Sequence, residues 1–217
     1  MTKKLVELFK QNPPKRCIKV AQGAAWLFQD LDAVVDDWIH RFGAKGMWRA
    51  ERDTCVQHCM VAKSLDEAIM RACASLRTNG KLHNHQSRVR KQDRDYFAVR
   101  ILKDLALPEV LGHFDDLYDF LNQVKPSGIG PVTVYDVATR IAAYLHLPIN
   151  SLYLHAGVQQ GWNMLHGGRG KGAGAPSKGV VARIPKAKLP KALQRLPCDE
   201  VEDMLCCYRD YLKPWCA

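Results

Sequence analysis

A short turn rich in glycine holds the residues of this chain best suited to binding an anion. Gly128, Ile129 and Gly130 are followed by Pro131, which suits the first position of a helix. Glycine lets the backbone adopt positive φ and lets a ligand approach without a Cβ in the way. The free amides of a helix's first turn bind phosphate. We therefore predict a phosphate site anchored by the amides of Gly128 and Gly130 and by Lys125. Ile129 is expected to plug the turn into the core.

Two helices must hold this turn in place. Apolar residues recur at helical spacing before it and after it, and either Asp115 or Asp116 is placed to cap the first helix. The first stripe is Phe114, Leu117, Leu121 and Val124, and the second is Val134, Val137, Ala138, Ile141 and Leu145. These spacings predict two helices joined by a tight turn over about residues 114–146.

A polar and basic connector lies earlier in the chain, over residues 81–91. Its candidate contact residues are His83, His85, Arg88, Arg90 and Lys91. Cations suit phosphate contacts, and an imidazole can position a water beside a scissile bond. The alternative is a solvated loop whose histidines cap the ends of neighbouring helices.

The charge of the chain points to an anionic partner. Its 217 residues include 32 Lys+Arg and 22 Asp+Glu, a formal net charge of +10, which favours association with nucleic acid. Eight basic residues and no acidic one fall over residues 167–195, among glycines, alanines and prolines. This composition predicts a flexible basic loop or arm that tracks phosphates, or alternatively a mobile solvated insertion.

Eight cysteines are scattered along the chain, and none forms a Cys-x-x-Cys pair. We expect buried free thiols in a reducing cytosol. Cys55, His58 and Cys59 share one helix face, as metal ligands do, but a zinc site needs a fourth ligand that the sequence does not specify. We therefore assign no metal ligands, and metal binding by these three residues stays an alternative.

Helical patterns extend over most of the remaining chain. Helices are expected at 18–42, 96–105, 151–165 and 199–212. Another is expected to begin at the capping box Ser64-Leu65-Asp66-Glu67 and to run through Leu76, with Asn79-Gly80 closing it. Strand-like alternation is nearly absent. The sequence therefore predicts an all-α fold, with residues 1–217 in a single multi-helix domain or in two lobes around a cleft.

Membrane attachment and secretion are not expected. No run of 18 apolar residues occurs, and the N-terminus lacks the apolar core and small-residue cleavage site of a signal peptide. We expect a cytoplasmic, nucleoid-associated protein without a membrane partner.

The two helices and their turn resemble the helix-hairpin-helix motif of DNA repair and recombination proteins. The residues that match the motif are Gly128, Ile129, Gly130, Pro131 and Thr133. Val134 stands where the family usually has a small residue. The resemblance implies that amides of the turn bind backbone phosphate without reading base sequence. It also implies a monovalent cation held by carbonyl oxygens of the turn, and we expect no other cofactor.

A wider resemblance, over residues 114–162, is to the helix-hairpin-helix DNA glycosylase superfamily. Val132 stands where bifunctional members have the lysine that forms a Schiff base, and Tyr153 stands where members have a catalytic aspartate. His155 matches a histidine that is frequent in the family. Because valine has no amine to attack a sugar, the resemblance implies no Schiff-base lyase activity.

Acid–base chemistry in such an enzyme would fall to Asp136, Tyr153 and His155. For Asp136 there is an alternative, because it lies four residues before Arg140 and can form an ordinary helix ion pair with it.

Three functions are therefore open. The first is a non-catalytic DNA-binding protein that contacts the phosphate backbone, as one part of a repair, defence or mobile-element assembly with a protein partner. The second is a diverged glycosylase-like or base-modifying enzyme. The third is a metal-dependent nuclease that uses His83, His85 and the acidic cluster of Glu200, Glu202 and Asp203.

Overall fold

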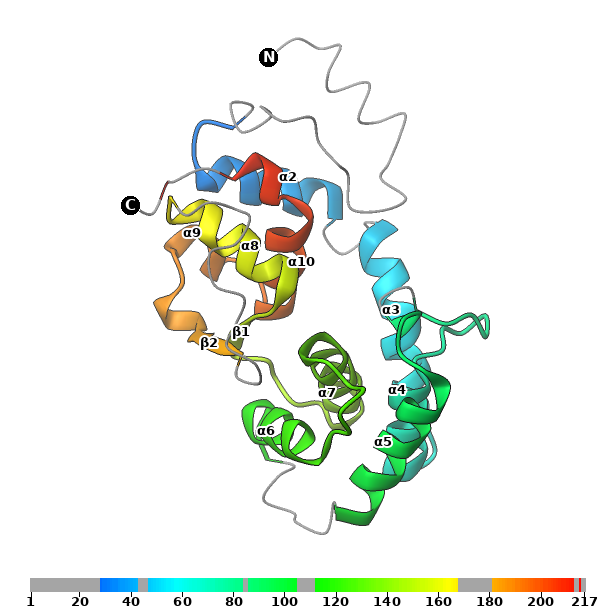
Figure 1. Ribbon diagram of the computed structural model, residues 1–217. Coiled ribbons are helices and arrows are strands. Elements are labelled where there is room, and N and C mark those ends of the chain that lie inside the picture. Colours follow the sequence, from blue (N-terminus) through cyan, green and yellow to red (C-terminus); the bar gives the residue numbers. More distant parts are fainter. Residues whose placement is uncertain are drawn as a thin grey trace. The chain divides into compact units, whose positions relative to one another are not determined.

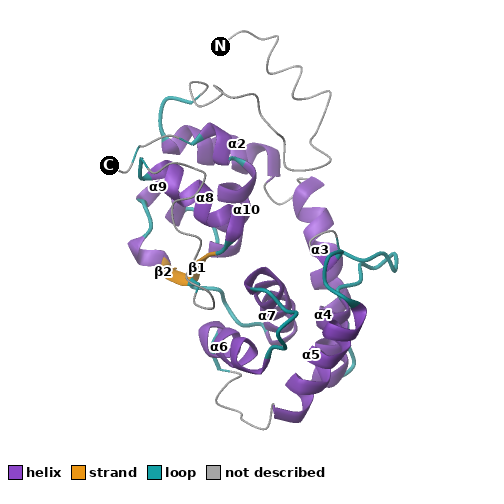
Figure 2. Cartoon of the chain, viewed as in Figure 1, coloured by secondary structure: helices purple, strands orange, loops and turns teal. Residues whose placement is uncertain are grey.

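Helices dominate the fold. The computed structural model of the chain describes residues 28–42, 47–83, 86–104, 112–167, 181–212 and 215. Within these residues the only sheet has two strands (Figure 2). The expected predominance of helices is confirmed.

The chain divides into two compact units, which we call unit 1 and unit 2. Unit 2 is one continuous stretch, residues 41–151. Unit 1 combines residues 1–40 with residues 152–217, so segments from before and after unit 2 in the sequence build it together.

Most of the described helices of unit 2 pack on one helix among them. In chain order they are α3 (Met47–Met60), α4 (Leu65–Ala74), α5 (Lys91–Asp104), α6 (Phe114–Val124) and α7 (Pro131–Leu145), labelled in Figure 1. Helix α7 contacts α3, α4 and α6, and α4 also packs on α5. The apolar stripe expected for α7 is buried from Val134 to Ile141, whereas Leu145 is half-buried. The stripe is therefore the core of this unit.

Helix α4 begins at the expected capping box but ends earlier than expected. The amide of Glu67 donates to Oγ of Ser64 at 3.2 Å, which confirms the cap. The helix stops at Ala74 because Ser75 adopts a left-handed conformation, with φ of 57°. Leu76, expected to be helical, instead forms an antiparallel bridge with Leu82.

Helix α5 begins at Lys91, five residues before the expected start. Its first turn is polar, so no apolar period marks it in the sequence. Two local interactions stabilise it, since Nζ of Lys91 lies 2.5 Å from Oδ2 of Asp95 and Arg90 donates to Asp93. The segment expected from the sequence covers only the second half of α5, which contains the buried side chains of Phe97 and Ile101.

Unit 1 contains the two-stranded sheet and a second group of helices. Its described elements are α2 (Leu31–Phe42, whose last two residues fall in unit 2), β1 (Ser151–Leu154, whose first residue does too), α8 (Ala156–Leu165), β2 (Ala182–Pro185), the 3-10 helix η4 (Lys186–Lys188), α9 (Lys191–Gln194), α10 (Cys198–Cys207) and the 3-10 helix η5 (Arg209–Tyr211). Of the expected helix at 18–42, residues 18–27 lie outside the described residues, and the rest is helical from Leu31.

Two expected helices of this unit need correction. Residues 151–165 are not one helix, because Ser151–Leu154 pairs with β2 as a strand. All four residues of that strand are buried. A strand buried on both faces has no alternation, so its pattern cannot be told from a buried helix. Residues 199–212 are also divided, because α10 ends at Cys207 and η5 follows.

The expected flexible basic segment at 167–195 is ordered in its second part. Residues 168–180 lie outside the described residues, whereas β2, η4 and α9 occupy most of the remainder. Leu189 and Leu193 are buried there, because isolated apolar residues between the cations supply enough surface to pack. Arg195 pairs with Asp36 and Asp32 of α2 at 2.5 and 3.2 Å, and the hydrogen bonds to these carboxylates raise its pKa. Part of the basic charge is thus engaged inside unit 1.

Helix α8 packs on α10 through its glycines. A Cβ at Gly161 would overlap the backbone carbonyl of Leu205, and a Cβ at Gly157 would overlap Sγ of Cys206. The two obstacles differ, because a cysteine side chain can rotate and a helix backbone cannot. Gly161 therefore sets how closely the two helices approach.

We predict that Gly161→Ala destabilises the protein more than Gly157→Ala does. The first change should lower the free energy of unfolding by about 2 kcal/mol, because forcing a methyl group against the α10 backbone outweighs the gain of about 1 kcal/mol in helix propensity. Urea denaturation of the two variants beside the unmodified protein measures both effects. Equal or greater stability of Gly161→Ala would show that the α8–α10 contact is loose.

Candidate nucleic-acid interface

The turn between α6 and α7 has the bounds that the sequence predicts. Helix α6 ends at Val124 and α7 begins at Pro131, so six residues connect them. Ile129 is 3% exposed, and its amide donates to the carbonyl oxygen of Pro126 at 3.0 Å. The expected apolar plug is confirmed. The cap of α6 differs from expectation, because His113 occupies the N-cap position and both aspartates lie in the first turn.

The start of α7 is open to solvent. Gly130 is its N-cap residue, with φ of −87°, and no side chain caps the helix. The first amide bonded in the helix is that of Val134, which donates to the carbonyl of Gly130 at 3.1 Å. The amides of Val132 and Thr133 precede it, and a Cβ at Gly130 would have nothing within 4 Å. Unpaired amides at the positive end of a helix dipole form a favourable environment for an anion.

Gly128 has a different role from Gly130. A Cβ at Gly128 would overlap the carboxylate of Asp93, which lies on the first turn of α5. Neither glycine of the turn has positive φ, so that expectation is wrong. A Cβ at Gly128 would force the Asp93 side chain of α5 to move, whereas a Cβ at Gly130 would meet open space.

The contact between Gly128 and Asp93 brings basic residues of the connector to the turn. Nε and Nη2 of Arg90 donate to Asp93 at 2.8 and 3.0 Å, and these hydrogen bonds raise the pKa of Arg90. The Arg90 side chain is 76% exposed and that of Lys91 is 80% exposed. Arg88 is also exposed. Two segments that sequence reasoning singled out separately therefore meet in unit 2.

The two histidines of the connector are placed differently. His83 is half-buried, and its amide donates to the carbonyl of Ser75 at 2.9 Å. His85 lies outside the described residues. Thr133 is 5% exposed, so its hydroxyl is not displayed on the surface of the turn. Lys125 is half-buried at the end of α6.

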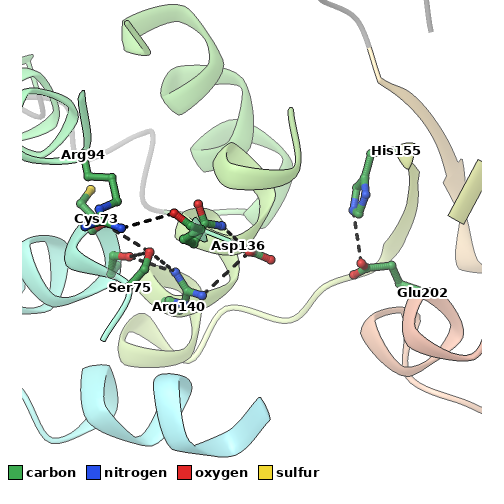
Figure 3. A network of polar contacts seen from close by, with 9 residues as sticks. Cys73, Ser75, Arg94, Asp136, Arg140, His155 and Glu202 are labelled. Carbon is green, nitrogen blue, oxygen red and sulfur yellow. Dashed lines mark hydrogen bonds and ion pairs between the residues drawn. The ribbon is translucent and has the colours of Figure 1, made fainter. Parts of the chain in front are cut away.

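Asp136 belongs to a buried polar network centred on Arg140 (Figure 3). Nη1 of Arg140 donates to Oγ of Ser75 at 2.8 Å and to the carbonyl of Ala72 at 3.0 Å. Its Nη2 lies 3.9 Å from Oδ2 of Asp136, which also accepts a bond of 2.6 Å from Nε2 of Gln86. Asp136 thus makes the ion pair that was the alternative to a catalytic role. Catalysis by Asp136 stays a prediction.

The other two candidate catalytic residues lie in unit 1. His155 is 5% exposed, and its Nε2 lies 3.3 Å from Oε1 of Glu202 on α10 (Figure 3). Tyr153 is fully buried, with the guanidinium of Arg183 5.2 Å above its ring centroid. Sequence reasoning named the acidic cluster but could not single out Glu202 as the neighbour of His155. In the part of the chain that is described, no three His, Cys, Asp or Glu side chains are placed to hold a metal ion.

Three buried thiols lie close enough to Arg140 for its charge to affect their pKa values. Burial raises the pKa of Cys59 to about 11 and also raises the pKa values of Cys55 and Cys73, while the charge of Arg140 partly opposes the shift. No disulfide joins any two of the six cysteines among the described residues. The thiols of α3 and α4 therefore stay protonated and neutral at physiological pH.

We predict that the three thiols near Arg140 resist alkylation in the folded protein. A brief treatment with iodoacetamide at mildly alkaline pH should modify the half-buried Cys206 and Cys207 before Cys55, Cys59 or Cys73, because thiolate and access are both needed. Peptide mass spectrometry identifies each site, and urea should abolish the difference. Early modification of Cys73 in the native protein would show that unit 2 opens readily.

No match is found for this chain among models of protein families, curated proteins or solved structures. The described helices include none that is long and apolar enough to cross a membrane. The function of the chain must therefore be inferred from its own residues and contacts.

Proposed function

We propose that this protein binds the phosphate backbone of DNA at the α6–α7 turn, with little preference for base sequence. The observation that carries the proposal is the open start of α7, where Gly130 leaves space and the amides of Val132 and Thr133 lie outside the helix ladder. A phosphate there would accept hydrogen bonds from backbone amides, which carry no base-specific information. This helix pair and its turn would then act as a helix-hairpin-helix motif.

The charges near the turn support an anionic ligand. Lys125 belongs to the turn, and Arg90 is joined to it through Asp93, which contacts Gly128. Arg88 and Lys91 are exposed neighbours of Arg90 in the sequence. The ion pair of Lys91 with Asp95 is largely exposed, and such pairs contribute little to stability. The cation of such a pair can therefore turn to a phosphate at small cost. The net charge of +10 would accelerate the encounter.

Asp93 restricts where the phosphate can lie. Its carboxylate occupies the side of the turn next to Gly128, where a second anion would be repelled. The side next to Gly130 has no such neighbour. The phosphate site in our proposal therefore comprises Gly130, Val132 and Thr133 with nearby cations, and Gly128 serves to seat the turn against α5.

A monovalent cation at the turn is part of the proposal. Among the described residues, no hydrogen bond is donated to the carbonyl oxygens of Ser127 and Gly128, so these oxygens fit a cation that prefers oxygen ligands. A cation there would place positive charge close to the bound backbone. We also propose that the protein is the DNA-binding part of a repair, defence or mobile-element assembly, with a protein partner and a location at the nucleoid.

We predict that Gly130→Asp separates DNA binding from folding. A carboxylate at the N-cap accepts the amide of Val132 or Thr133 and stabilises α7 by up to about 1 kcal/mol, but it places negative charge where the phosphate binds. Affinity for a labelled duplex, measured by fluorescence anisotropy, should fall by roughly tenfold or more. The slope of log K against log salt should decrease by about one unit, because the variant neutralises one phosphate fewer.

Gly130→Asn is the matched control, because asparagine caps the helix without adding a charge. Its affinity should lie between those of the Asp variant and the unmodified protein. Thermal unfolding followed by circular dichroism checks that both variants fold. Unchanged duplex affinity in a folded Gly130→Asp protein would remove the start of α7 from the interface. Replacing Gly128 would not test this, because its Cβ would collide with Asp93.

The pairing of His155 with Glu202 favours a second candidate, a diverged glycosylase-like or base-modifying enzyme. A carboxylate beside an imidazole orients the ring and stabilises its protonated form, which is the usual arrangement for general acid–base catalysis. The 3.3 Å separation of the two groups is that of an ion pair. Such an enzyme would work without a Schiff base, because Val132 has no amine.

For this second candidate we predict that borohydride traps no covalent complex with DNA that contains abasic sites. If base excision or modification is found, His155→Gln and Glu202→Gln should each reduce its kcat by about 10²-fold, because both disturb the same proton transfer. Tyr153→Phe tests the remaining candidate. Trapping of the unmodified protein would show that another amine acts as nucleophile. Activity that all three substitutions leave unchanged would show that His155, Glu202 and Tyr153 take no part in the reaction.

A further inference from the structure

Tyr96 is exposed in a way that its surroundings do not explain. It is 52% exposed on α5, and it is the only aromatic residue among the exposed large apolar side chains in the part of the chain whose burial is described. Within the same part of the chain its side chain forms no hydrogen bond, ion pair or ring contact. The other aromatic side chains whose burial is described are buried or half-buried. Packing within the described fold therefore gives Tyr96 no role.

The position of Tyr96 on α5 relates it to the turn. Asp93, which contacts Gly128, lies one helical turn before Tyr96, and Arg100 lies one turn after it. Residues at i, i+3 and i+7 share one side of a helix. Tyr96 therefore lies on the same side of α5 as Asp93, about 4.5 Å further along the helix axis.

Cations lie before and after Tyr96 on the same helix. Arg90 and Lys91 precede it and are exposed, and the Arg100 side chain is 38% exposed. Val99, which is 55% exposed, extends the apolar surface beside the ring. Cations alternating with an exposed aromatic ring are the arrangement by which proteins hold a single strand, because the cations contact phosphates and the ring stacks on a base. In a duplex the base faces are already stacked on one another.

We propose that Tyr96 stacks on an unpaired base, so that the ligand of unit 2 includes single-stranded nucleic acid whose backbone is held at the α6–α7 turn. This inference rests on the proposed function and adds the strand state to it. A protein partner is the alternative occupant of this surface. Such a partner would need an apolar side chain at position 96, but that side chain would not have to be aromatic. The two occupants differ in how they respond to the loss of aromaticity at residue 96.

The test compares Tyr96→Leu with Tyr96→Phe. Leucine keeps an apolar side chain without a ring, and phenylalanine keeps the ring without the hydroxyl. Affinity for a labelled single-stranded oligonucleotide should fall about 5-fold or more in the Leu variant and stay within about 2-fold in the Phe variant. Affinity for a duplex of the same length should be unchanged in both. Circular dichroism confirms that these surface variants fold.

An oligonucleotide with abasic residues at successive positions adds a second measurement, because it has the same phosphates and no base to stack. The unmodified protein should bind it more weakly than the intact strand, whereas Tyr96→Leu should bind the two equally. In a strand containing 5-bromodeoxyuridine, ultraviolet light should crosslink Tyr96, as identified by peptide mass spectrometry.

The outcomes separate this inference from the proposed function. Binding of the unmodified protein to neither single strand nor duplex would overturn both. Binding that Tyr96→Leu leaves unchanged for every ligand would overturn the stacking and leave the backbone contact standing. Equal weakening in the Leu and Phe variants would also overturn stacking, because it would show that the hydroxyl and not the ring is recognised.

Discussion

The buried guanidinium of Arg140 is the constraint from which the arrangement of unit 2 follows. A charge with 4% exposure must be satisfied by hydrogen bonds and an opposite charge. Arg140 donates its hydrogen bonds to the end of α4, and Asp136 is its ion-pair partner at 3.9 Å. Asp136 accepts from Gln86, which is fully buried, and the carbonyl of Gln86 accepts from Arg94 at 3.4 Å. This chain of contacts fixes the path of the connector into α5. Asp93 is thereby placed against the turn, so the candidate interface depends on a residue far from its surface.

Periodicity and local chemistry made much of the fold predictable. The bounds of α6 and α7, the plug at Ile129 and the Ser64 cap all depend on residues within a few positions of one another. The strand β1 and the start of α5 could not be found in this way. Ser151–Leu154 is buried without alternation, and the first turn of α5 has no apolar period. Both are specified by what packs against them, which a local pattern does not record.

The candidate site could likewise be predicted from the sequence only in part. Sequence reasoning found the glycines and the basic connector, but it gave Gly128 and Gly130 the same role and missed Asp93 and Tyr96. The contact of Asp93 with Gly128 joins positions 35 residues apart, and nothing in either segment signals it. A clue to Arg140 was available, because an arginine within the apolar stripe of α7 must find buried partners. The closeness of His155 and Glu202 likewise depends on how α8 packs on α10.

The discontinuous make-up of unit 1 has a consequence for synthesis on the ribosome. Trp38 of α2 packs edge-to-face on Tyr208, with ring centroids 5.3 Å apart, and Asp37 accepts a hydrogen bond from the hydroxyl of Tyr208. These partners are translated after the whole of unit 2. Because unit 2 is continuous in the sequence, it can fold first during elongation, while the apolar face of α2 stays uncovered. The nascent chain therefore exposes Trp38 until Tyr208 has been translated, which makes α2 a segment that a chaperone would protect during synthesis.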